Sequence, residues 1–536
     1  MTSLNDLLFD PVQEAEESKA IEQYVRENGC LIRTGDENES NRKEALEILE
    51  TMIQEWTSSL LEQTKESTQN EQRTNVVLPT LITFGSYRLR VHRLDSDVDV
   101  LGLFPDHVSR EMFFSGFTNV LEKDERVSKL LSIQTAYTPI IKFYLNGINI
   151  DMLFGRVSNN EKLEQFHETR RHTTTTFEGE YFIDDQDLVG VDELTVRSIN
   201  GVRVTQCIET IVVEHVDDFR VCLCAIKQWA AINGIYSNVL GFLGGVNYAI
   251  LLAKVCLESF PKLNESCHPS VLLKLFFRKY AFHKWPLPIM LTTKISHNAP
   301  TKVKKIQVWD PKLNPRDARH VMPIITPAYP SMNSSYNVGF PQLRRIQEEM
   351  IRAAILLEER EGGWKNLFRK SSFFQRHSNF LQIKVSSSSS SSSSNATDHT
   401  NWIRFCQTKL RLLINSLESL QMSAWPFSNF FHQDTKEEER SSFFFIALRF
   451  TSNVETLNLK QFTLDFLHKV NSWEERKPGM DIDIQHVLQE DLPKFLHEED
   501  NEDENLDNMK EDGRLLDNDF QDESKEPEAK RRKKVL

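Results

Sequence analysis

Two aspartates, Asp97 and Asp99, are separated by a single residue at the start of a short apolar run. In a strand, side chains two apart point to the same face of the sheet, about 6 to 7 Å from one another. A third carboxylate, Asp151, stands in a second alternating run, Ile148 to Phe154, whose apolar residues face the other way. Three carboxylates from two strands are suitable ligands for two divalent ions. The pattern predicts a metal site of the kind that binds a nucleoside triphosphate.

A glycine and a serine precede Asp97 by ten intervening residues. Gly85 and Ser86 follow the apolar segment Leu78 to Phe84, which we expect to be a strand, and they end it sharply. Such a turn exposes backbone N–H groups and a hydroxyl to which a phosphate can bind. In front of Asp151, the dipeptide Asn146-Gly147 predicts a tight hairpin turn.

A second group of candidate residues follows an expected helix, Phe219 to Ile232. Lys227 lies beside the buried stripe of that helix, and a lysine in this position is commonly a surface residue with a buried stem. Soon after it come Tyr236, Asn238 and the glycine-rich turn Gly241 to Val246. A lysine, a tyrosine hydroxyl and a glycine turn that opens a helix suit a triphosphate and a base. The glycine run alone matches neither a P-loop nor the dinucleotide fingerprint.

The order of these motifs resembles that of the nucleotidyltransferase superfamily that includes DNA polymerase β, and more closely that of eukaryotic nuclear poly(A) polymerases. The resemblance is carried by four blocks that come in the family's order, dense from about Phe84 to Val338. They are FGSYRL with the following VH, SD and D, then PIIKFYLNGINIDMLF, AIKQWAAINGIYSNVLGFLGGVNYAILLAKVC, and WDPKLNPRDARHVMPIITPAYPSMNSSYNV.

The resemblance implies a role for each matching residue. Asp97, Asp99 and Asp151 would be catalytic and would hold two Mg²⁺ or Mn²⁺ ions. ATP would be bound by these aspartates and by Phe84, Gly85, Ser86, Lys227, Tyr236, Gly245 and Val246. The RNA 3′ end or the base would be contacted by Tyr137, Lys142, Asn200 and Asn238. The resemblance also implies a monomer, partner subunits of a cleavage and polyadenylation complex, and a nuclear location.

One turn departs from the family's pattern. Arg90, Arg93, Leu94 and Asp95 replace the small residues, mostly glycine and proline, that usually precede the aspartates. The substituted turn is bulkier and charged. It either strengthens contact with RNA phosphates or reshapes a loop, and the sequence does not separate these alternatives.

Hydrophobic periodicity and turn residues predict the remaining elements. Residues 1 to 77 have a helical pattern, and so does Ser109 to Leu121. A strand is expected over Ala136 to Tyr144. Leu194 to Thr205 resembles the family segment Leu-Asn-Gly-x-Arg that closes the catalytic domain, matched by Asn200, Gly201 and Arg203, whereas its residues alone predict a loop. Further expected helices are Leu343 to Leu357, Asn401 to Leu420 and Leu459 to Asn471, and further strands are Asn379 to Val385 and Ser442 to Phe450. The nine serines Ser386 to Ser394 predict a flexible loop.

A chain of 536 residues is too long for one core. We expect an α+β multidomain protein with a polymerase β-like nucleotidyltransferase catalytic domain over 1–211, whose first residues pack on the next domain. A helical middle domain over 212–363 and an RNA-recognition-like α/β sandwich over 364–497 would follow. A disordered acidic tail over 498–536 completes the chain.

Composition excludes several classes of protein. No run of eighteen apolar residues and no basic-then-apolar N-terminal segment is present, so neither a membrane span nor a secretory signal is expected. Seven scattered cysteines lack the paired spacing of a zinc site, and their odd number argues against a disulfide framework.

The net charge of −14 is concentrated near the C-terminus. Residues 498–528 hold fifteen acidic and three basic residues, and the cluster Lys530 to Lys534 adds five positive charges, which leaves about −7 for the rest. RNA binding must therefore use local basic patches rather than a basic body. The terminal cluster is of the nuclear-import type.

The predicted function is template-independent addition of AMP from ATP to the 3′-OH of an mRNA precursor, with release of pyrophosphate. A terminal nucleotidyltransferase that uses UTP or CTP would share the metal triad and stays an alternative. An RNA-binding scaffold without catalytic activity is an alternative from another class, against which the intact aspartates argue.

Overall fold

The structure is a computed structural model and describes residues 10–31, 37–68, 77–157, 161, 163–164, 183–263, 268–293, 295, 306–358, 363–388, 392–418, 422–436, 439–450 and 459–496. The described chain forms two compact units. The first contains residues up to Ala230 together with Leu243–Val338 and Gln347–Arg369, and the second contains Ala231–Phe242, Gly339–Ile346 and the residues from Lys370 onward. The acidic tail and the terminal basic cluster lie outside the described residues.

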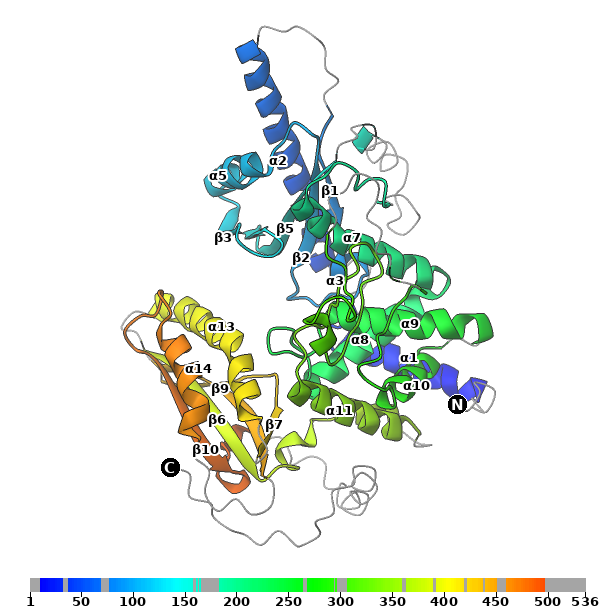
Figure 1. The fold of residues 1–536 in the computed structure, drawn as a ribbon, viewed down its shortest axis with the longest axis vertical. Coiled ribbons are helices and arrows are strands. Elements are labelled where there is room, and N and C mark those ends of the chain that lie inside the picture. The colour runs from blue at the N-terminus through cyan, green and yellow to red at the C-terminus, as the bar shows by residue number, and fades with distance from the viewer. Residues whose placement is uncertain are drawn as a thin grey trace. The chain divides into compact units, whose positions relative to one another are not determined.

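The first unit is built around a five-stranded mixed sheet with the strand order β1-β2-β5-β4-β3 (Figure 1). Strands β2 and β5 are parallel neighbours, and the other pairs are antiparallel. Asn146 and Gly147 both have positive φ, 49° and 80°, and join β4 to β5 in the predicted hairpin. The strands are β1 (Thr80–Thr83), β2 (Val98–Phe104), β3 (Val127–Ile133), β4 (Ile140–Leu145) and β5 (Ile148–Arg156).

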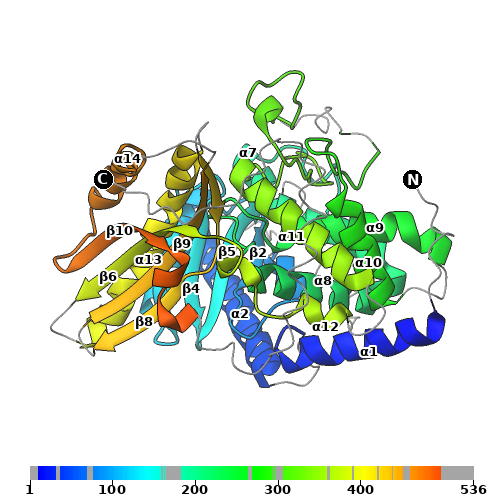
Figure 2. The same ribbon diagram turned by 90° about the horizontal axis from the view of Figure 1, so that it is seen from below.

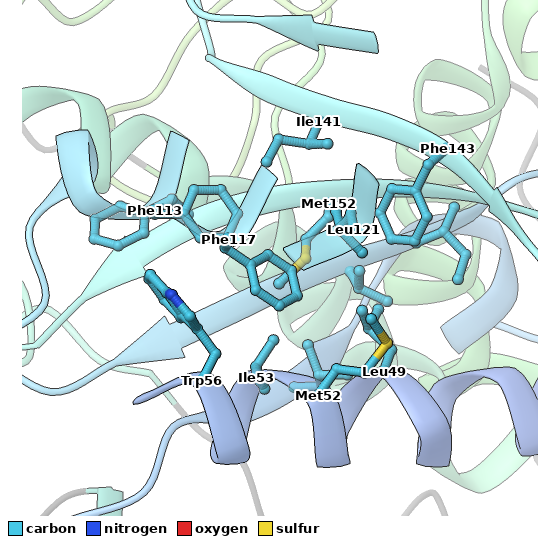
Figure 3. Packing of buried hydrophobic residues seen from close by; sticks show 14 of the residues in the cluster. Leu49, Met52, Ile53, Trp56, Phe113, Phe117, Leu121, Ile141, Phe143 and Met152 are labelled. Carbon is cyan, nitrogen blue, oxygen red and sulfur yellow. The ribbon is translucent and has the colours of Figure 1, made fainter. Parts of the chain in front are cut away.

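Helix α2 (Glu37–Thr68) covers one face of this sheet (Figure 3). Its stripe of Leu49, Ile53 and Trp56 packs on Phe117 and on Met152 of β5 within one buried cluster. The helix predicted over Ser109 to Leu121 closes the cluster as three continuous helical pieces, α4 (Arg110–Met112), the π-helical Phe113–Phe117 and α5 (Thr118–Lys123).

Helix α7 (Glu193–Val212) covers the opposite face, so the loop that the residues Leu194 to Thr205 predict by themselves is wrong. Asp192 caps its N-terminus by accepting a hydrogen bond from the Thr195 N–H at 3.0 Å. Val196, Ile199 and Val202 pack against the sheet. Polar and β-branched residues between these positions hide the stripe in the sequence, and burial against the sheet stabilises the helix.

Further helices complete the first unit. They are α1 (Pro11–Glu27), α8 (Val216–Ile232), α9 (Gly245–Leu263), α10 (Pro269–Ala281), α11 (Phe340–Glu358) and α12 (Gly363–Leu367), of which α8 and α11 each continue partly into the second unit. Helix α1 packs along α10 (Figure 2), where the Ser18 and Ser270 hydroxyls lie 2.8 Å apart and Lys274 pairs with Glu14 at 2.6 Å.

The second unit contains an antiparallel sheet with the order β10-β6-β9-β7, and β8 also pairs with β9. Helices α13 (Ser392–Leu417) and α14 (Lys460–Asn471) pack on each other, and α13 also packs on the sheet (Figure 1). The strands are β6 (Asn379–Ser388), β7 (Met422–Pro426), β8 (Phe431–Lys436), β9 (Glu439–Phe450) and β10 (Met480–Leu488).

The serine tract is not a simple loop. Ser386 to Ser388 continue β6 and pair with β9, Ser386 and Ser387 also pair with β10, and α13 begins at Ser392. The Ser387 hydroxyl is buried 2.9 Å from Nδ1 of His399. Pairing with two neighbouring strands supplies hydrogen bonds that serine composition does not reveal, so the prediction of a flexible loop is wrong for the tract's described residues.

The two sheets with their covering helices confirm the mixed α and β fold class. Among the described residues, no helix is long and apolar enough to cross a membrane. Six cysteines, all in the described ranges, are free thiols.

Candidate active site

The three predicted carboxylates meet at one end of the parallel strand pair. Asp99 on β2 lies directly opposite Asp151 on β5, and Asp97 immediately precedes β2. One carboxylate oxygen from each aspartate lies within 4.8 Å of the others. This arrangement follows from the parallel pairing, which places corresponding residues of the two strands side by side.

The electrostatics of this cluster are unfavourable without cations. Burial, followed by the charges of Asp97 and Asp151, raises the pKa of Asp99 from 3.8 to about 7. Burial also raises the pKa of Asp151, although a hydrogen bond and ion pair from Lys142, its cross-strand neighbour, partly oppose the shift. Carboxylates held together in this way require positive charge from outside the triad.

The residues fit divalent metal ions. Asp151 Oδ1 is buried and has no hydrogen-bond partner among the described residues, although the other oxygen of the same carboxylate pairs with Lys142. A buried acceptor without a partner is costly and is well suited to a ligand. Carboxylate oxygens are the donors that Mg²⁺ and Mn²⁺ prefer.

Gly85 approaches the carboxylates more closely than another residue would allow. Its φ is +65°, and a Cβ atom there would lie 2.5 Å from Oδ2 of Asp99. The preceding Phe84 donates its N–H to the Asp99 carbonyl at 3.1 Å. The Gly85 N–H donates to Oγ1 of Thr205 on α7 at 3.1 Å. The prediction that this N–H is exposed for a phosphate is therefore wrong, because α7 already supplies its acceptor.

Gly85 and Ser86 open a single helical turn, α3 (Gly85–Arg88). The ring of Phe84 lies against Gly201 of α7, where an added Cβ would meet it at 2.7 Å. Arg88 pairs with Glu209 of α7 at 2.7 Å. Helix α7 thus holds the glycine-serine turn beside Asp99, a role that the sequence does not indicate.

The charged turn between α3 and β2 is held through its backbone carbonyls. On α8, Lys227 donates to the Val91 carbonyl at 2.6 Å, and Arg220 donates to the Leu89 carbonyl at 3.1 Å. Arg93 in the turn donates to Oε1 of Gln228 at 2.8 Å. We call residues 89–96 the aspartate loop, because Asp97 follows it directly.

Lys227 lies against this loop in the structure. Burial is the main cause that lowers the pKa of its ammonium, and the contact with the Val91 carbonyl supplies one hydrogen bond. Sequence reasoning predicts a phosphate contact for Lys227 and did not foresee its contact with the loop.

Arg42 of α2 also contacts the aspartate loop, and sequence reasoning missed it. Its Nη2 donates to the carbonyls of Leu94 at 2.9 Å and Ser96 at 2.8 Å. Burial lowers the pKa of Arg42, and the negative charges of Glu39 and Asp97 oppose that shift. The available signal was its position, because Arg42 continues the buried stripe of Ala45 and Leu49, where a charged residue is rare.

Gly245 and Val246, predicted to line the nucleotide site, begin α9 in the same unit as the aspartates. Val246 is 47% exposed. The side chain of buried Asn247 accepts from the Gly244 N–H at 2.8 Å and donates to Ser334 Oγ at 2.8 Å. Asn247 therefore fixes the turn that presents Val246.

Three of the predicted RNA contacts also belong to the first unit. Tyr137 is 58% exposed, with the Arg197 guanidinium 3.9 Å from its ring centroid. Asn200 of α7 donates to the Pro330 carbonyl at 3.0 Å, and its Oδ1 is buried without a partner among the described residues. Lys142 pairs with Asp151.

Tyr236 and Asn238 belong to the second unit. The Tyr236 N–H donates to the Ser428 hydroxyl at 3.2 Å, and the Asn238 carbonyl accepts from the Gly241 N–H at 3.1 Å. Within that unit the segment is tied to the β7–β8 connection.

Three family models match successive parts of the chain. The poly(A) polymerase nucleotidyltransferase domain matches residues 11–212, and the poly(A) polymerase central domain matches residues 218–370. The poly(A) polymerase predicted RNA binding domain matches residues 372–442 and 431–505.

Relatives of known name are similar over most of this chain. A poly(A) polymerase of Dictyostelium discoideum is 33% identical over 480 residues, which are 86% of this chain and 55% of that protein. Nuclear poly(A) polymerase 1 of Arabidopsis thaliana is 32% identical over 490 residues, or 89% and 63% of the two chains. The chain thus spans little more than half the length of these relatives.

Among solved structures, a Cid1 poly(U) polymerase aligns with 66% of this chain and 99% of its own, at 17% identity and a TM-score of 0.43. An identity and a TM-score this low say nothing about which nucleotide this chain uses. The family models and the relatives together confirm the resemblance drawn from the sequence motifs. The chain belongs to the poly(A) polymerase family.

Proposed function

We propose that this protein is a polynucleotide adenylyltransferase that adds AMP from ATP to the 3′-OH of mRNA precursors. The observation that carries the proposal is the convergence of Asp97, Asp99 and Asp151 at the parallel strand pair of a chain in this family. These relatives are named poly(A) polymerases, and that name supports ATP as the nucleotide.

The aspartates would hold two Mg²⁺ or Mn²⁺ ions. When bound, such ions lower the pKa of an attacking hydroxyl and neutralise the charge of a leaving pyrophosphate. Asp97 and Asp99 would ligate both ions, and Asp151 would share the one nearer the RNA 3′ end through its unpaired Oδ1. Lys142, paired with the other oxygen of Asp151, would orient that carboxylate and lie near the RNA.

Other residues of the chain would position the substrates. Ser86, in the turn that Gly85 holds against Asp99, would contact the triphosphate, and Phe84 would line its binding site. Lys227 and Tyr236 would bind the outer phosphates, while Gly245 and Val246 would line the base. Tyr137, Asn200 and Asn238 would contact RNA or the base.

The domains would divide this work. Residues 1–211 would supply the chemistry, residues 212–363 the second wall of the nucleotide site, and residues 364–497 the RNA-binding surface. The basic cluster Lys530 to Lys534 would direct the protein to the nucleus. The name of the Arabidopsis thaliana relative, nuclear poly(A) polymerase 1, supports this location. The protein would be a monomer, and subunits of a cleavage and polyadenylation complex would recruit it.

The decisive experiment offers the purified protein a labelled oligoribonucleotide and one nucleoside triphosphate at a time, with Mg²⁺ or Mn²⁺. We expect extension with ATP and little with UTP, CTP or GTP. A preference for UTP or CTP would replace polyadenylation by another terminal transfer.

The scaffold alternative requires a separate control. Asp99→Ala should abolish extension and largely preserve RNA binding, because it removes a metal ligand from a partly buried position without touching the RNA-binding domain. If the wild-type protein fails to extend RNA with every nucleotide tested, in Mg²⁺ as well as in Mn²⁺, the scaffold becomes the better account.

A further inference from the structure

The backbone hydrogen bonds within the aspartate loop and its flanks are concentrated at the two ends of the loop. The N–H groups of Leu89, Arg90 and Val91 donate to the carbonyls of Gly85, Tyr87 and Ser86 at 3.0 to 3.1 Å. At the other end, the Ser96 N–H donates to the Arg93 carbonyl at 3.1 Å and the Arg93 N–H donates to the Ser96 hydroxyl at 3.0 Å. Arg90 adopts a φ of +57°, which is unusual for a residue other than glycine. The carbonyls of Leu94 and Ser96 accept none of these five hydrogen bonds, and a partner from another element, Arg42 of α2, satisfies them.

Arg42 supplies that support next to the metal ligands. Its Nη2 lies 2.9 Å from the Leu94 carbonyl, 2.8 Å from the Ser96 carbonyl and 3.4 Å from the Arg93 carbonyl. Ser96 directly precedes Asp97, so the 2.8 Å contact fixes the peptide group from which the Asp97 backbone starts.

The guanidinium is held through Nε and Nη2, while its buried Nη1 has no partner among the described residues. Arg42 is among the largest fully buried side chains of the molecule, and its Nε donates to Oδ1 of Asn38 at 2.8 Å on the same helix. Arg42 begins the stripe that continues through Ala45, Leu49 and Ile53 into the core under the sheet. Burying a guanidinium is costly unless it is hydrogen-bonded, so the loop carbonyls and the arginine depend on one another.

We propose that Arg42 is a positioning residue, which sets the affinity of the aspartate triad for divalent ions by fixing the aspartate loop relative to the sheet. Asp99 and Asp151 are held by strand pairing, whereas Asp97 precedes β2 and takes its position from the loop. Of the three ligands, Asp97 is thus the one that Arg42 controls. The inference rests on the metal centre of the proposed function.

The test measures Mn²⁺ binding to the full-length protein by isothermal titration calorimetry, without nucleotide or RNA. Arg42→Met keeps the length and removes the donors, and it should raise the Mn²⁺ dissociation constant about tenfold or more, as loss of a supporting contact around metal ligands commonly does. Arg42→Lys keeps the charge but reaches fewer carbonyls and should give an intermediate loss.

Arg203→Met is the matched control. Arg203 is also a buried arginine that donates to backbone carbonyls, those of Ile183 at 3.1 Å and Tyr329 at 2.8 Å, but neither acceptor lies in the aspartate loop. We expect it to lower thermal stability as Arg42→Met does and to leave Mn²⁺ affinity unchanged. A loss of affinity in both variants would show general destabilisation and overturn the proposal.

The possible failures are distinguishable. If wild type binds Mn²⁺ and folded Arg42→Met binds it equally well, the positioning role is wrong and the proposed function stands. If Arg42→Met does not fold, unchanged affinity in Arg42→Lys overturns the role, and an intermediate loss supports it. If wild type itself takes up no Mn²⁺, the metal centre of the proposed function fails and takes this inference with it.

Discussion

Gly85 and Asp99 are in closer contact than any residue with a Cβ atom would permit. The Cβ of a substituted residue would lie 2.5 Å from Oδ2 of Asp99, and the backbone of Gly85 has a φ of +65°. The backbone of the glycine-serine turn therefore lies directly against a metal-ligand carboxylate.

Gly85→Ala should displace the Asp99 carboxylate and strain the turn. We expect at least about a 100-fold loss of extension rate, since small displacements of catalytic groups have such effects. The free energy of unfolding should fall by about 1 to 2 kcal/mol because of the left-handed backbone. Primer extension and chemical denaturation measure the two effects.

Gly147→Ala separates these effects. Gly147 has a φ of +80°, yet a Cβ there would meet nothing within 4 Å. The variant should lose similar stability and keep its activity. Wild-type activity in Gly85→Ala would contradict the proposed contact between the turn and the active carboxylate.

The raised pKa of Asp99 predicts a pH dependence of stability in the absence of divalent ions. The folded state binds a proton with a pKa of about 7, whereas the ordinary value is 3.8, so the folded state holds more protons between these values. The contribution of Asp99 to stability therefore falls as the pH rises from about 4 to about 7. Denaturation in EDTA at several pH values should show this loss in wild type.

Asp99→Asn should remove that dependence. Above pH 7 the variant should be more stable than wild type by about 1 kcal/mol, because it relieves repulsion at a functional site. Mn²⁺ should stabilise wild type and not the variant. Asp95→Asn, which changes a side chain that is 87% exposed, is the control. If the free energy of unfolding of wild type and Asp99→Asn had the same pH dependence, the raised pKa of Asp99 would be contradicted.

Lys227→Met tests whether the ammonium that contacts the Val91 carbonyl also binds phosphate. A phosphate contact predicts about a tenfold loss of affinity for ATP and none for adenosine, because a charge-assisted hydrogen bond is lost only with the triphosphate. Equilibrium binding of both ligands measures the difference.

Arg220→Met is the control for Lys227, because Arg220 also extends from α8 to a carbonyl of the aspartate loop, that of Leu89. It should lower stability without a selective loss of ATP affinity. An equal loss of ATP and adenosine affinity in Lys227→Met would leave Lys227 with a structural role alone.

Tyr137→Ala should weaken RNA binding. The ring is 58% exposed and has Arg197 over one face at 3.9 Å, which leaves the tyrosine held in a position to stack on a base. Loss of one stacked base costs about 1 to 3 kcal/mol. Fluorescence anisotropy with a short oligoribonucleotide measures the change.

Tyr144→Ala provides a comparison within the same β3–β4 hairpin, because Tyr144 lies on β4 and also has a cation over its ring, Lys129 at 4.6 Å from the ring centroid. Tyr137 lies in the turn between β3 and β4. No RNA contact is proposed for Tyr144, so its variant should bind RNA as wild type does. Equal weakening by both substitutions would assign the effect to the β3–β4 hairpin as a whole rather than to stacking on Tyr137.

Local sequence patterns were sufficient to predict the elements whose conformation depends only on residues near one another in the chain. Alternation in two apolar runs predicted the strands that carry Asp99 and Asp151, and Asn146-Gly147 predicted the hairpin between β4 and β5. These features follow from the two-residue period of a strand and from the φ values that glycine and asparagine tolerate. The family resemblance then supplied the identity of the site.

The sequence by itself determined the three carboxylates and the glycine beside them. Only the tertiary structure decided what holds them. Helix α7 was hidden by the polar and β-branched residues between its apolar positions. The contacts of Arg42, Lys227 and Thr205 join elements far apart in the chain. Such contacts depend on how helices pack on a sheet. Packing decides which distant acceptor a buried N–H or hydroxyl group bonds, and no local sequence pattern reveals that acceptor.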